Sequence, residues 1–327
     1  MRKFLFILFC LLATCTFAAK PLSDSAQIHL LTCTQGEQVW SKYGHTAIRV
    51  IDYPNQIDIV FNYGVFSLMD EDFYIKFVKG ETYYQLGIEP YNYFMAFYSS
   101  IGRKTYWQEL NLTHQQKQRI YDALITNYRP ENRYYLYNFV FDNCATRPYY
   151  LIKQALQDTI ISDYQGYANH DFRSTISHYT GKHSWVDFGI NLVFGSDANR
   201  PMTNEERLFL PEELMRYFAQ SHLSDGTPLV RRQHIGAFDT MHTPWYATCW
   251  FGIALFAVLM LLLTLHDRRR QRLTIAVDIT LIIIYLLLIA LVVFLTFFSC
   301  HPLVGFNWRL ILIPLIHLCA RLVYLLR

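Results

Sequence analysis

The chain has 327 residues, of which 52% are hydrophobic and 17% are charged, and its formal net charge is +3. Ordinary soluble domains contain about 25% charged residues, so this composition argues against a disordered protein and against a wholly soluble one. The lysines and arginines are too few and too scattered to form the basic surface that nucleic-acid binding needs. We therefore expect no nucleic-acid partner.

The N-terminus has the layout of a secretory signal peptide. Met1-Arg2-Lys3 precede an apolar run over residues 4–12, and small residues end at Ala18-Ala19. We predict a signal peptide over residues 1–19. Leu12-Ala13-Thr14-Cys15 is also a loose lipobox, although Thr14 is a poor residue before the cysteine, so lipidation of Cys15 is a minor alternative.

Two C-terminal segments, Trp245 to Leu265 and Ile275 to Phe298, are each long enough to cross about 30 Å of hydrocarbon. The short basic loop 266–272 between them is expected to stay in the cytoplasm, because positive charge is retained on that side. The preceding segment is then extracytoplasmic, in agreement with the signal peptide. A third, weaker segment, Trp308 to Leu326, contains two arginines and a proline and ends close to the last residue, which leaves open whether the natural protein continues.

These features predict a signal peptide (1–19), a domain outside the inner membrane (20–243) and a transmembrane region (244–327).

Two cysteines, Cys33 and Cys144, lie in the outer domain. In an oxidising compartment they could form a disulfide, which would make the domain a non-catalytic module. The sequence contains no C-x-x-C and no H-E-x-x-H, and we expect neither metal nor cofactor. A weak alternative is a zinc site formed by His170, Asp171, His178 and His183.

Cys144 has the setting of a nucleophile. An aromatic, extended segment (134–141) leads to Asp142-Asn143-Cys144-Ala145-Thr146-Arg147-Pro148, and a helical pattern follows over residues 149–156. Asp142 or Asn143 is a natural helix N-cap. Pro148 is tolerated because the first turn of a helix has no intrahelical partners for its N–H groups. The sequence therefore places Cys144 at a helix N-terminus, where the helix dipole favours the thiolate.

The best candidate base for Cys144 lies far upstream, on a predicted hairpin. Residues 45–51 alternate as a strand, Asp52-Tyr53-Pro54-Asn55 reads as a turn, and residues 57–63 form the return strand with their odd-numbered residues on the core face. Folding about the turn centre puts Arg49 opposite Asp58, Ala47 opposite Val60 and His45 opposite Asn62. The opposite-charge pair supports this register. Asn62 is then able to orient the His45 ring, although a merely solvated polar face is the alternative.

The order of a strand histidine, a polar residue on the next strand and Asn-Cys at a helix start is similar to permuted papain-like enzymes typified by lecithin:retinol acyltransferase. The chain resembles more closely the periplasmic domain of the Lnb family, which is associated with Bacteroidota and with N-acylation of lipoproteins. The most specific blocks are Gly44-His45-Thr46-Ala47-Ile48-Arg49 and Asn143-Cys144-Ala145-Thr146-Arg147. The likeness runs from about Ile28 to Gly195 and continues at residues 299–302 and 307–308.

This resemblance implies an α+β, permuted papain-like (NlpC-like) periplasmic domain followed by transmembrane helices. It implies an acyltransferase of the inner membrane, in which Cys144 takes an acyl chain from a phospholipid as a thioester and passes it to the N-terminal amine of a diacylglyceryl-cysteine lipoprotein. His45 would act as the base and Asn62 would orient it. Further candidates for substrate contact or an accessory role are Tyr43, Arg49, Asn143, Arg147 and His301.

Another class of enzyme would use the same machinery. A membrane-tethered NlpC-like cysteine peptidase or amidase acting on cell-wall peptides also needs a cysteine and a histidine. An open polar groove would favour that class, whereas an apolar groove facing the membrane would favour acyl transfer.

Overall fold

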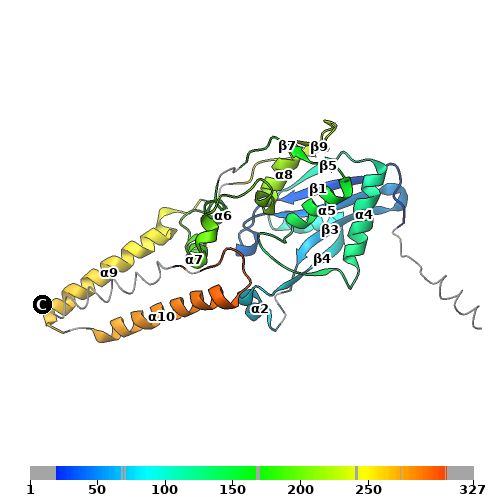
Figure 1. The fold of residues 1–327 in the computed structure, drawn as a ribbon. Coiled ribbons are helices and arrows are strands. Elements are labelled where there is room, and N and C mark those ends of the chain that lie inside the picture. The colour runs from blue at the N-terminus through cyan, green and yellow to red at the C-terminus, as the bar shows by residue number, and fades with distance from the viewer. Residues whose placement is uncertain are drawn as a thin grey trace, which may run out of the picture.

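The computed structural model describes residues 20–67, 69, 71–166, 170–239, 242–272, 274–305 and 307. The predicted signal peptide and the third apolar segment lie outside these residues. Figure 1 shows a sheet covered by helices, from which two long helices extend away in the same general direction. The structure thus confirms a mixed helix-and-sheet domain followed by two apolar C-terminal helices.

A seven-stranded antiparallel sheet forms the centre of the domain, in the order β6-β4-β3-β2-β1-β5-β9. Its strands are β1 (Gln27–Cys33), β2 (His45–Asp52), β3 (Ile57–Val65), β4 (Tyr83–Pro90), β5 (Thr105–Leu110), β6 (Tyr134–Leu136) and β9 (Val230–His234). The extended segment predicted over residues 134–141 is a strand only as far as Leu136. A small second sheet pairs β7 (Ile161–Ser162) with β8 (Ser221–His222).

The predicted hairpin is present as β2 and β3, but its register is shifted by two residues. Arg49 pairs with Val60 and Ile51 with Asp58, so the predicted Arg49–Asp58 backbone pairing was wrong. The cause is the turn, which is a 3-10 helix (η2, Tyr53–Asn55) followed by Gln56 in the left-handed region at φ 58°. A shift of two keeps every side chain on its predicted face, because side chains alternate with a period of two.

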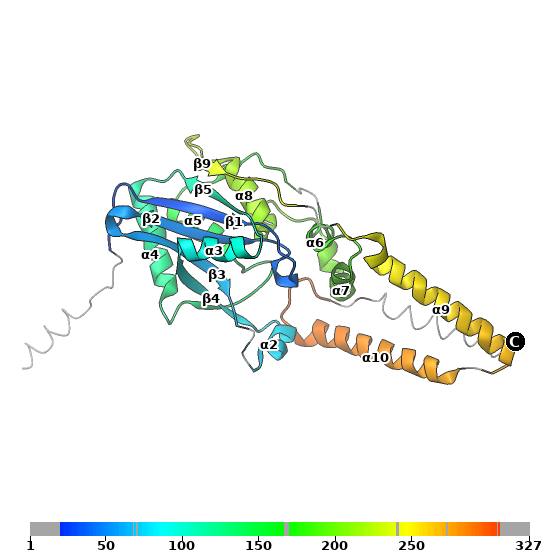
Figure 2. The same ribbon diagram turned by 180° about the vertical axis from the view of Figure 1, so that it is seen from behind.

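Helices cover both faces of the sheet. One face packs against α4 (His114–Tyr128), α5 (Thr146–Leu156) and α8 (Pro211–Ala219), as Figure 1 shows. The predicted core residues Phe61 and Tyr63 are buried there. The opposite face is covered by α3 (Tyr91–Ser100), seen from behind in Figure 2. The second face of the hairpin is therefore buried, with Ala47 and Val60 packed under α3, and is not the solvated surface of the alternative interpretation.

Shorter elements connect the sheet to the C-terminal helices. They are η1 (Val39–Ser41), α2 (Phe73–Lys79), α6 (Phe172–Thr180), α7 (Trp185–Val193), η3 (Ser196–Asn199) and η4 (Glu206–Phe209). α6, η3, η4 and α8 share a second apolar cluster with Val140 and Phe238.

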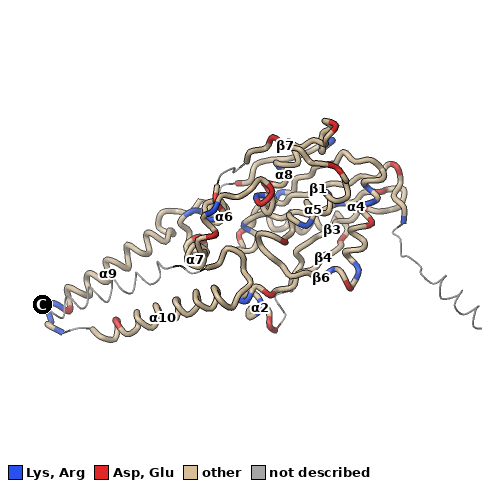
Figure 3. Tube along the Cα trace, in the orientation of Figure 1, with Lys and Arg blue, Asp and Glu red and all other residues tan. Residues whose placement is uncertain are grey.

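The two long helices are α9 (Cys249–Arg270) and α10 (Ile275–Phe298), and both are long and apolar enough to cross a membrane. α10 has the predicted bounds, whereas Trp245–Ala247 form a 3-10 turn (η5) before α9. Figure 3 shows Lys and Arg gathered at the end of this helix pair that lies away from the domain. Arg268, Arg269 and Arg270 form the last turn of α9, where they also complement the helix dipole.

Candidate active site

Cys144 lies in a tight turn just before α5, and Asn143 builds this turn. The Asn143 side-chain oxygen accepts hydrogen bonds from the backbone N–H groups of Ala145 (2.8 Å) and Thr146 (2.9 Å). Its amide nitrogen donates to the carbonyls of Phe139 and Phe209, both at 2.8 Å. Because these bonds use both ends of a buried amide, Asn143 holds the backbone around Cys144 and is not available to a substrate.

An ion pair straddles the same turn. Arg147 donates two hydrogen bonds to Asp142, Nε to Oδ1 at 2.6 Å and Nη2 to Oδ2 at 2.7 Å. The guanidinium also lies 3.6 Å from the centre of the Tyr135 ring. The predicted accessory residue Arg147 therefore links the turn before α5 to strand β6.

His45 begins β2, and its ring is held by an amide and a carboxylate. Its Nε2 lies 2.6 Å from Oδ1 of Asn62, and Nδ2 of Asn62 donates to Glu89 at 3.2 Å. The Glu89 carboxylate can only accept, so it turns the amide oxygen of Asn62 toward the ring. Nε2 then carries the imidazole proton and Nδ1 is left as the basic nitrogen. The ring also stacks on Tyr98 of α3, with the centroids 6.1 Å apart and the planes at 12°.

His45 and Cys144 converge at Gly64, near the end of β3. A methyl group added to Gly64 would lie 3.6 Å from Cβ of Cys144, 4.0 Å from Cε1 of His45 and 4.0 Å from Oη of Tyr135. Gly64 has a φ of +93° at a β-bulge, a conformation that side chains rarely adopt. His45 comes from the sheet face under α3, whereas Cys144 packs on the face under α5. Both side chains therefore approach Gly64, the position of the bulged strand that carries no side chain.

The electrostatics of this pair favour two neutral groups. Burial raises the pKa of the Cys144 thiol to about 11, although the backbone N–H groups of Thr46 and Cys144 itself oppose this shift. Burial also lowers the pKa of His45 to about 4, against the effect of its hydrogen bond to Asn62. Burial is thus the largest influence on the pKa values of both groups. These shifts favour a neutral thiol beside an uncharged imidazole at neutral pH, whereas the position before a helix favours the thiolate.

Three residues at this site carried no signal in the sequence. Glu89 orients Asn62 from β4, and Tyr135 reaches Gly64 from β6. Arg103 lies between α3 and β5, donates from Nε to the carbonyl of Thr34 at 2.6 Å, and stands 4.8 Å from the Tyr98 ring centre. Its positive charge lowers the pKa values of both His45 and Cys144. No local motif marks these positions, because strand pairing and packing alone bring them to the site.

The structure contradicts the disulfide alternative. Cys33 and Cys144 are both free, and Cys33 is buried at the end of β1, with its sulfur 3.6 Å from the hydroxyl of Thr105. Burial raises the pKa of Cys33 to about 12, which keeps it a neutral thiol. In the described part of the chain, His170, Asp171, His178 and His183 do not form a group that could hold a metal ion.

The remaining predicted accessory residues lie at different distances from Cys144. Tyr43 packs 4.6 Å from the ring of Phe139, whose carbonyl accepts from Asn143. Arg49 is four residues along β2 from His45, which is about 13 Å of extended strand, and its charge is used by a bidentate bond to Asp58. His301 follows α10 and bonds the carbonyl of Phe77 at 2.5 Å. Arg49 and His301 are therefore not brought to Cys144.

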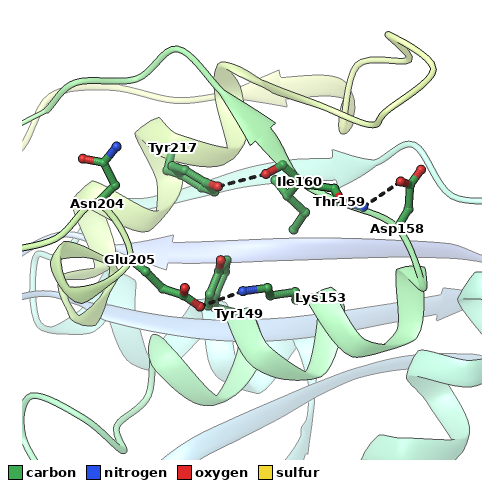
Figure 4. Close-up of a pocket in the computed structure, with 8 residues that line it drawn as sticks. All are labelled: Tyr149, Lys153, Asp158, Thr159, Ile160, Asn204, Glu205 and Tyr217. Carbon is green, nitrogen blue, oxygen red and sulfur yellow. Dashed lines mark hydrogen bonds and ion pairs between the residues drawn. The ribbon is translucent and has the colours of Figure 1, made fainter.

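Two cavities of the described structure lie along α5. The first, of about 290 Å³, is lined by Tyr149, Tyr217 and the Lys153–Glu205 ion pair, which Figure 4 shows together with its other lining residues. None of these is one of the site residues above. The second, also about 290 Å³, borders the outer side of Arg147 and Asp142. Neither cavity includes Cys144 or His45.

Comparison with known families gives two matches to this chain. Residues 14–176 match the Lnb N-terminal periplasmic domain, and residues 240–327 match the Lnb transmembrane domain. No curated protein and no solved structure matches the chain. The first match contains His45, Asn62 and Cys144, and the second contains α9 and α10. The chain is therefore a member of the Lnb family, with a periplasmic domain joined to a transmembrane region.

Proposed function

We propose that this protein is a thiol acyltransferase of the inner membrane, which moves an acyl chain from a phospholipid to the N-terminal amine of a diacylglyceryl-cysteine lipoprotein. The observation that carries the proposal is the convergence of His45 and Cys144 at Gly64, with Asn62 on the far side of the imidazole. Membership of the Lnb family supports a lipoprotein-related role. We also propose that the domain is a permuted form of the papain-like fold.

In the first step, Nδ1 of His45 takes the thiol proton as the sulfur of Cys144 attacks the ester carbonyl of the phospholipid. The tetrahedral intermediate collapses with cleavage of the ester C–O bond, and His45 returns the proton to the departing glycerol oxygen. The products are a Cys144 thioester and a lyso-phospholipid. A neutral starting pair suits this step, because the proton moves as the C–S bond forms and no buried charge has to be maintained beforehand.

In the second step, the lipoprotein amine attacks the thioester carbonyl and gives a proton to Nδ1 of His45. The C–S bond breaks, and the sulfur recovers that proton. An amide is more stable than a thioester, so the reaction runs in the direction of N-acylation. Both substrates are held in the same membrane as α9 and α10, which gives them a high effective concentration at the domain.

The test uses the full chain in phospholipid vesicles with a synthetic lipopeptide that carries diacylglyceryl-cysteine at its N-terminus. Mass spectrometry measures the N-acylated peptide and the acyl-enzyme. We expect product and a Cys144-linked acyl group with the parent protein, and neither product with Cys144→Ala or His45→Ala. Cys33→Ala is the matched control, because it removes another free cysteine and should retain activity.

Parent-level N-acylation by Cys144→Ala would overturn the proposed nucleophile. Release of free fatty acid without amide would identify a hydrolase. Cleavage of a cell-wall peptide by the same protein, with no acyl transfer, would instead support the peptidase class.

A further inference from the structure

The short helix α2 presents an apolar surface. Tyr74, Ile75 and Phe77 are 70%, 61% and 50% exposed, and Met69 just before the helix is 93% exposed. Phe73 alone in this helix is buried. Exposed apolar side chains gathered on so short an element mark an interaction surface.

This surface is fixed to the end of a membrane-spanning helix. The backbone N–H of Cys300 donates to the carbonyl of Lys79 at 2.7 Å, and Nε2 of His301 donates to the carbonyl of Phe77 at 2.5 Å. Figures 1 and 2 both show α2 against the domain end of α10. α10 ends at Phe298, which is 68% exposed. A membrane span that ends there would place α2 at the depth where the hydrocarbon layer gives way to headgroups.

Stacked aromatic rings connect α2 to the neighbourhood of Cys144. The ring centroids of Phe77 and Phe73 are 6.0 Å apart, and those of Phe73 and Phe66 are 5.8 Å apart. Phe66 stacks on Tyr84 at 4.7 Å, and Tyr84 stacks on Tyr137 at 4.1 Å. Tyr84 belongs to the apolar cluster against which Phe66, Tyr137 and Cys144 also pack, so the run of rings ends in the cluster that contains Cys144.

We propose that α2 lies within the outer interfacial layer of the bilayer and that the donor's acyl chain reaches Cys144 along these aromatic rings. Lipid covers the apolar side chains of α2, because α2 adjoins the end of α10 at the surface of the bilayer. Lys79 at the end of the same helix can extend its ammonium group to the lipid phosphates, whereas Lys76 pairs with Asp72 at 3.8 Å. This inference rests on the proposed function and names where its lipid substrate enters.

Site-specific cross-linking tests the location of α2. The photoreactive residue p-benzoylphenylalanine replaces Tyr74 in the full chain carrying Cys144→Ala, reconstituted in vesicles of phosphatidylethanolamine and phosphatidylglycerol with radiolabelled acyl chains. The matched control is the same replacement at Tyr53, which is also 70% exposed but lies at the hairpin turn. We expect labelled lipid on position 74 and not on position 53. Cross-links from position 74 to protein alone would overturn the inference. The assay needs no catalysis, so its outcome is independent of the proposed reaction.

A second measurement tests delivery of the acyl chain. Ile75→Asn should reduce acyl-enzyme formation from vesicle lipid by about tenfold, because an amide is costly to place among acyl chains. In the Ile75→Asn variant, iodoacetamide should alkylate Cys144 at the same rate as in the parent, since the nucleophile is unaltered. Ile161→Asn, which changes another exposed isoleucine, is the control. Equal acyl-enzyme formation by Ile75→Asn and the parent would show that α2 does not deliver the chain.

A separate observation concerns the hydroxyl of Tyr135. Among the described residues this buried oxygen has no hydrogen-bond partner, although an unpaired buried hydroxyl is costly. The Tyr135 Oη lies 4.0 Å from the position that a Cβ on Gly64 would occupy. The same position is 3.6 Å from Cβ of Cys144. The ring is fixed by the guanidinium of Arg147 at 3.6 Å and by Tyr63, whose ring centroid is 6.3 Å away.

We infer that Tyr135 donates its hydroxyl hydrogen to the oxyanion that forms when Cys144 attacks a carbonyl, again on the basis of the proposed function. A fixed donor that is unpaired before the reaction is able to stabilise the charge that develops in the tetrahedral state. Burial keeps the hydroxyl protonated, because it raises the pKa of Tyr135 well above its usual value.

Tyr135→Phe tests this role, because it keeps the ring that Arg147 contacts and removes only the oxygen. We expect kcat to fall by about 100-fold with little change in KM. Inhibition by an acyl aldehyde, which forms a tetrahedral adduct with the thiol, should weaken by a similar factor, and alkylation by iodoacetamide should not change. Tyr63→Phe is the control, because its hydroxyl bonds Asn127 and does not face the site. Unchanged kcat and aldehyde affinity in Tyr135→Phe would overturn the assignment without affecting the role of Cys144.

Discussion

Nε2 of His45 and Oδ1 of Asn62 lie 2.6 Å apart although their backbones are not paired across β2 and β3. The observed register, continued along the strands, places Gly64 and not Asn62 opposite His45. The contact is therefore diagonal, and it leaves the directly opposite position without a side chain. This vacancy at Gly64 gives Cys144 access to the imidazole.

Asn62→Ala is expected to lower kcat by about 10- to 100-fold, because the imidazole loses the partner that fixes its tautomer and orientation. KM should change little, since Asn62 bonds His45 and Glu89 and is not placed to bind a substrate. Steady-state acyl transfer in vesicles measures both constants. Glu89→Gln should have a smaller effect, because a glutamine oxygen can still accept from Asn62. Full activity in Asn62→Ala would contradict the orienting role.

The rate should depend on pH in a way that reflects a neutral pair. The pKa of His45 is lowered to about 4, so its imidazole remains a base at any pH well above that value. We expect kcat/KM to be level across neutral pH and to fall about tenfold per unit once the pH is below about 4. A thiolate–imidazolium resting pair would instead produce an acidic limb set by the thiol. A pH–rate profile, with recovery of activity on return to pH 7, separates titration from irreversible loss.

The same histidine shifts predict a loss of stability in acid. Burial lowers the pKa values of His29 and His45 from 6.5 to about 4. Between these pH values the unfolded chain binds more protons than the folded one, so the free energy of unfolding should fall as the pH drops from 6.5 to 4. Denaturant titrations of the full chain in detergent, compared with His29→Gln, measure this slope. The variant should show a shallower slope, and an unchanged slope would exclude His29 as a contributor.

Gly64→Ala should impair catalysis more than any other single added methyl group near the site. Its φ of +93° makes an alanine there strained, at a cost of about 1–2 kcal/mol. The methyl group would also stand between Cβ of Cys144 and Cε1 of His45. Thermal unfolding measures the cost of the strain, and acyl-enzyme formation measures the effect of the methyl group on catalysis. Gly102→Ala shares a positive φ but has open space around it, so it should cost stability without loss of activity.

Breaking the Asp142–Arg147 pair should loosen the turn that carries Cys144. Arg147→Lys keeps the charge but loses the bidentate geometry and the planar contact with Tyr135. The pair is partly exposed, so we expect a loss of only about 1 kcal/mol in the free energy of unfolding, together with a lower kcat. Lys153→Ala, which breaks the ion pair farther along α5, should cost similar stability and leave kcat unchanged. Equal kcat in Arg147→Lys and the parent would remove Arg147 from the positioning of Cys144.

Local patterns in the sequence determined a good part of this protein. The apolar lengths determined α10 to the residue, and alternation along residues 57–63 identified the core face of β3. These two features depend on hydrophobic periodicity, which is visible without a fold. The grouping of His45, Asn62 and Cys144 was instead indicated by the resemblance of their sequence blocks to a known family, because His45 and Cys144 lie far apart in the chain.

Only the tertiary structure decided the register, the electrostatics and the partners of the site. The turn after Asp52 contains one 3-10 helix and a left-handed residue, which no residue pattern specified, and it shifted the pairing by two. Desolvation depends on what packs over a group, so the raised pKa of Cys144 follows from burial, which its place before a helix did not predict. Glu89, Arg103 and Tyr135 reach the site from separate strands and loops, because contacts between distant segments are created by packing.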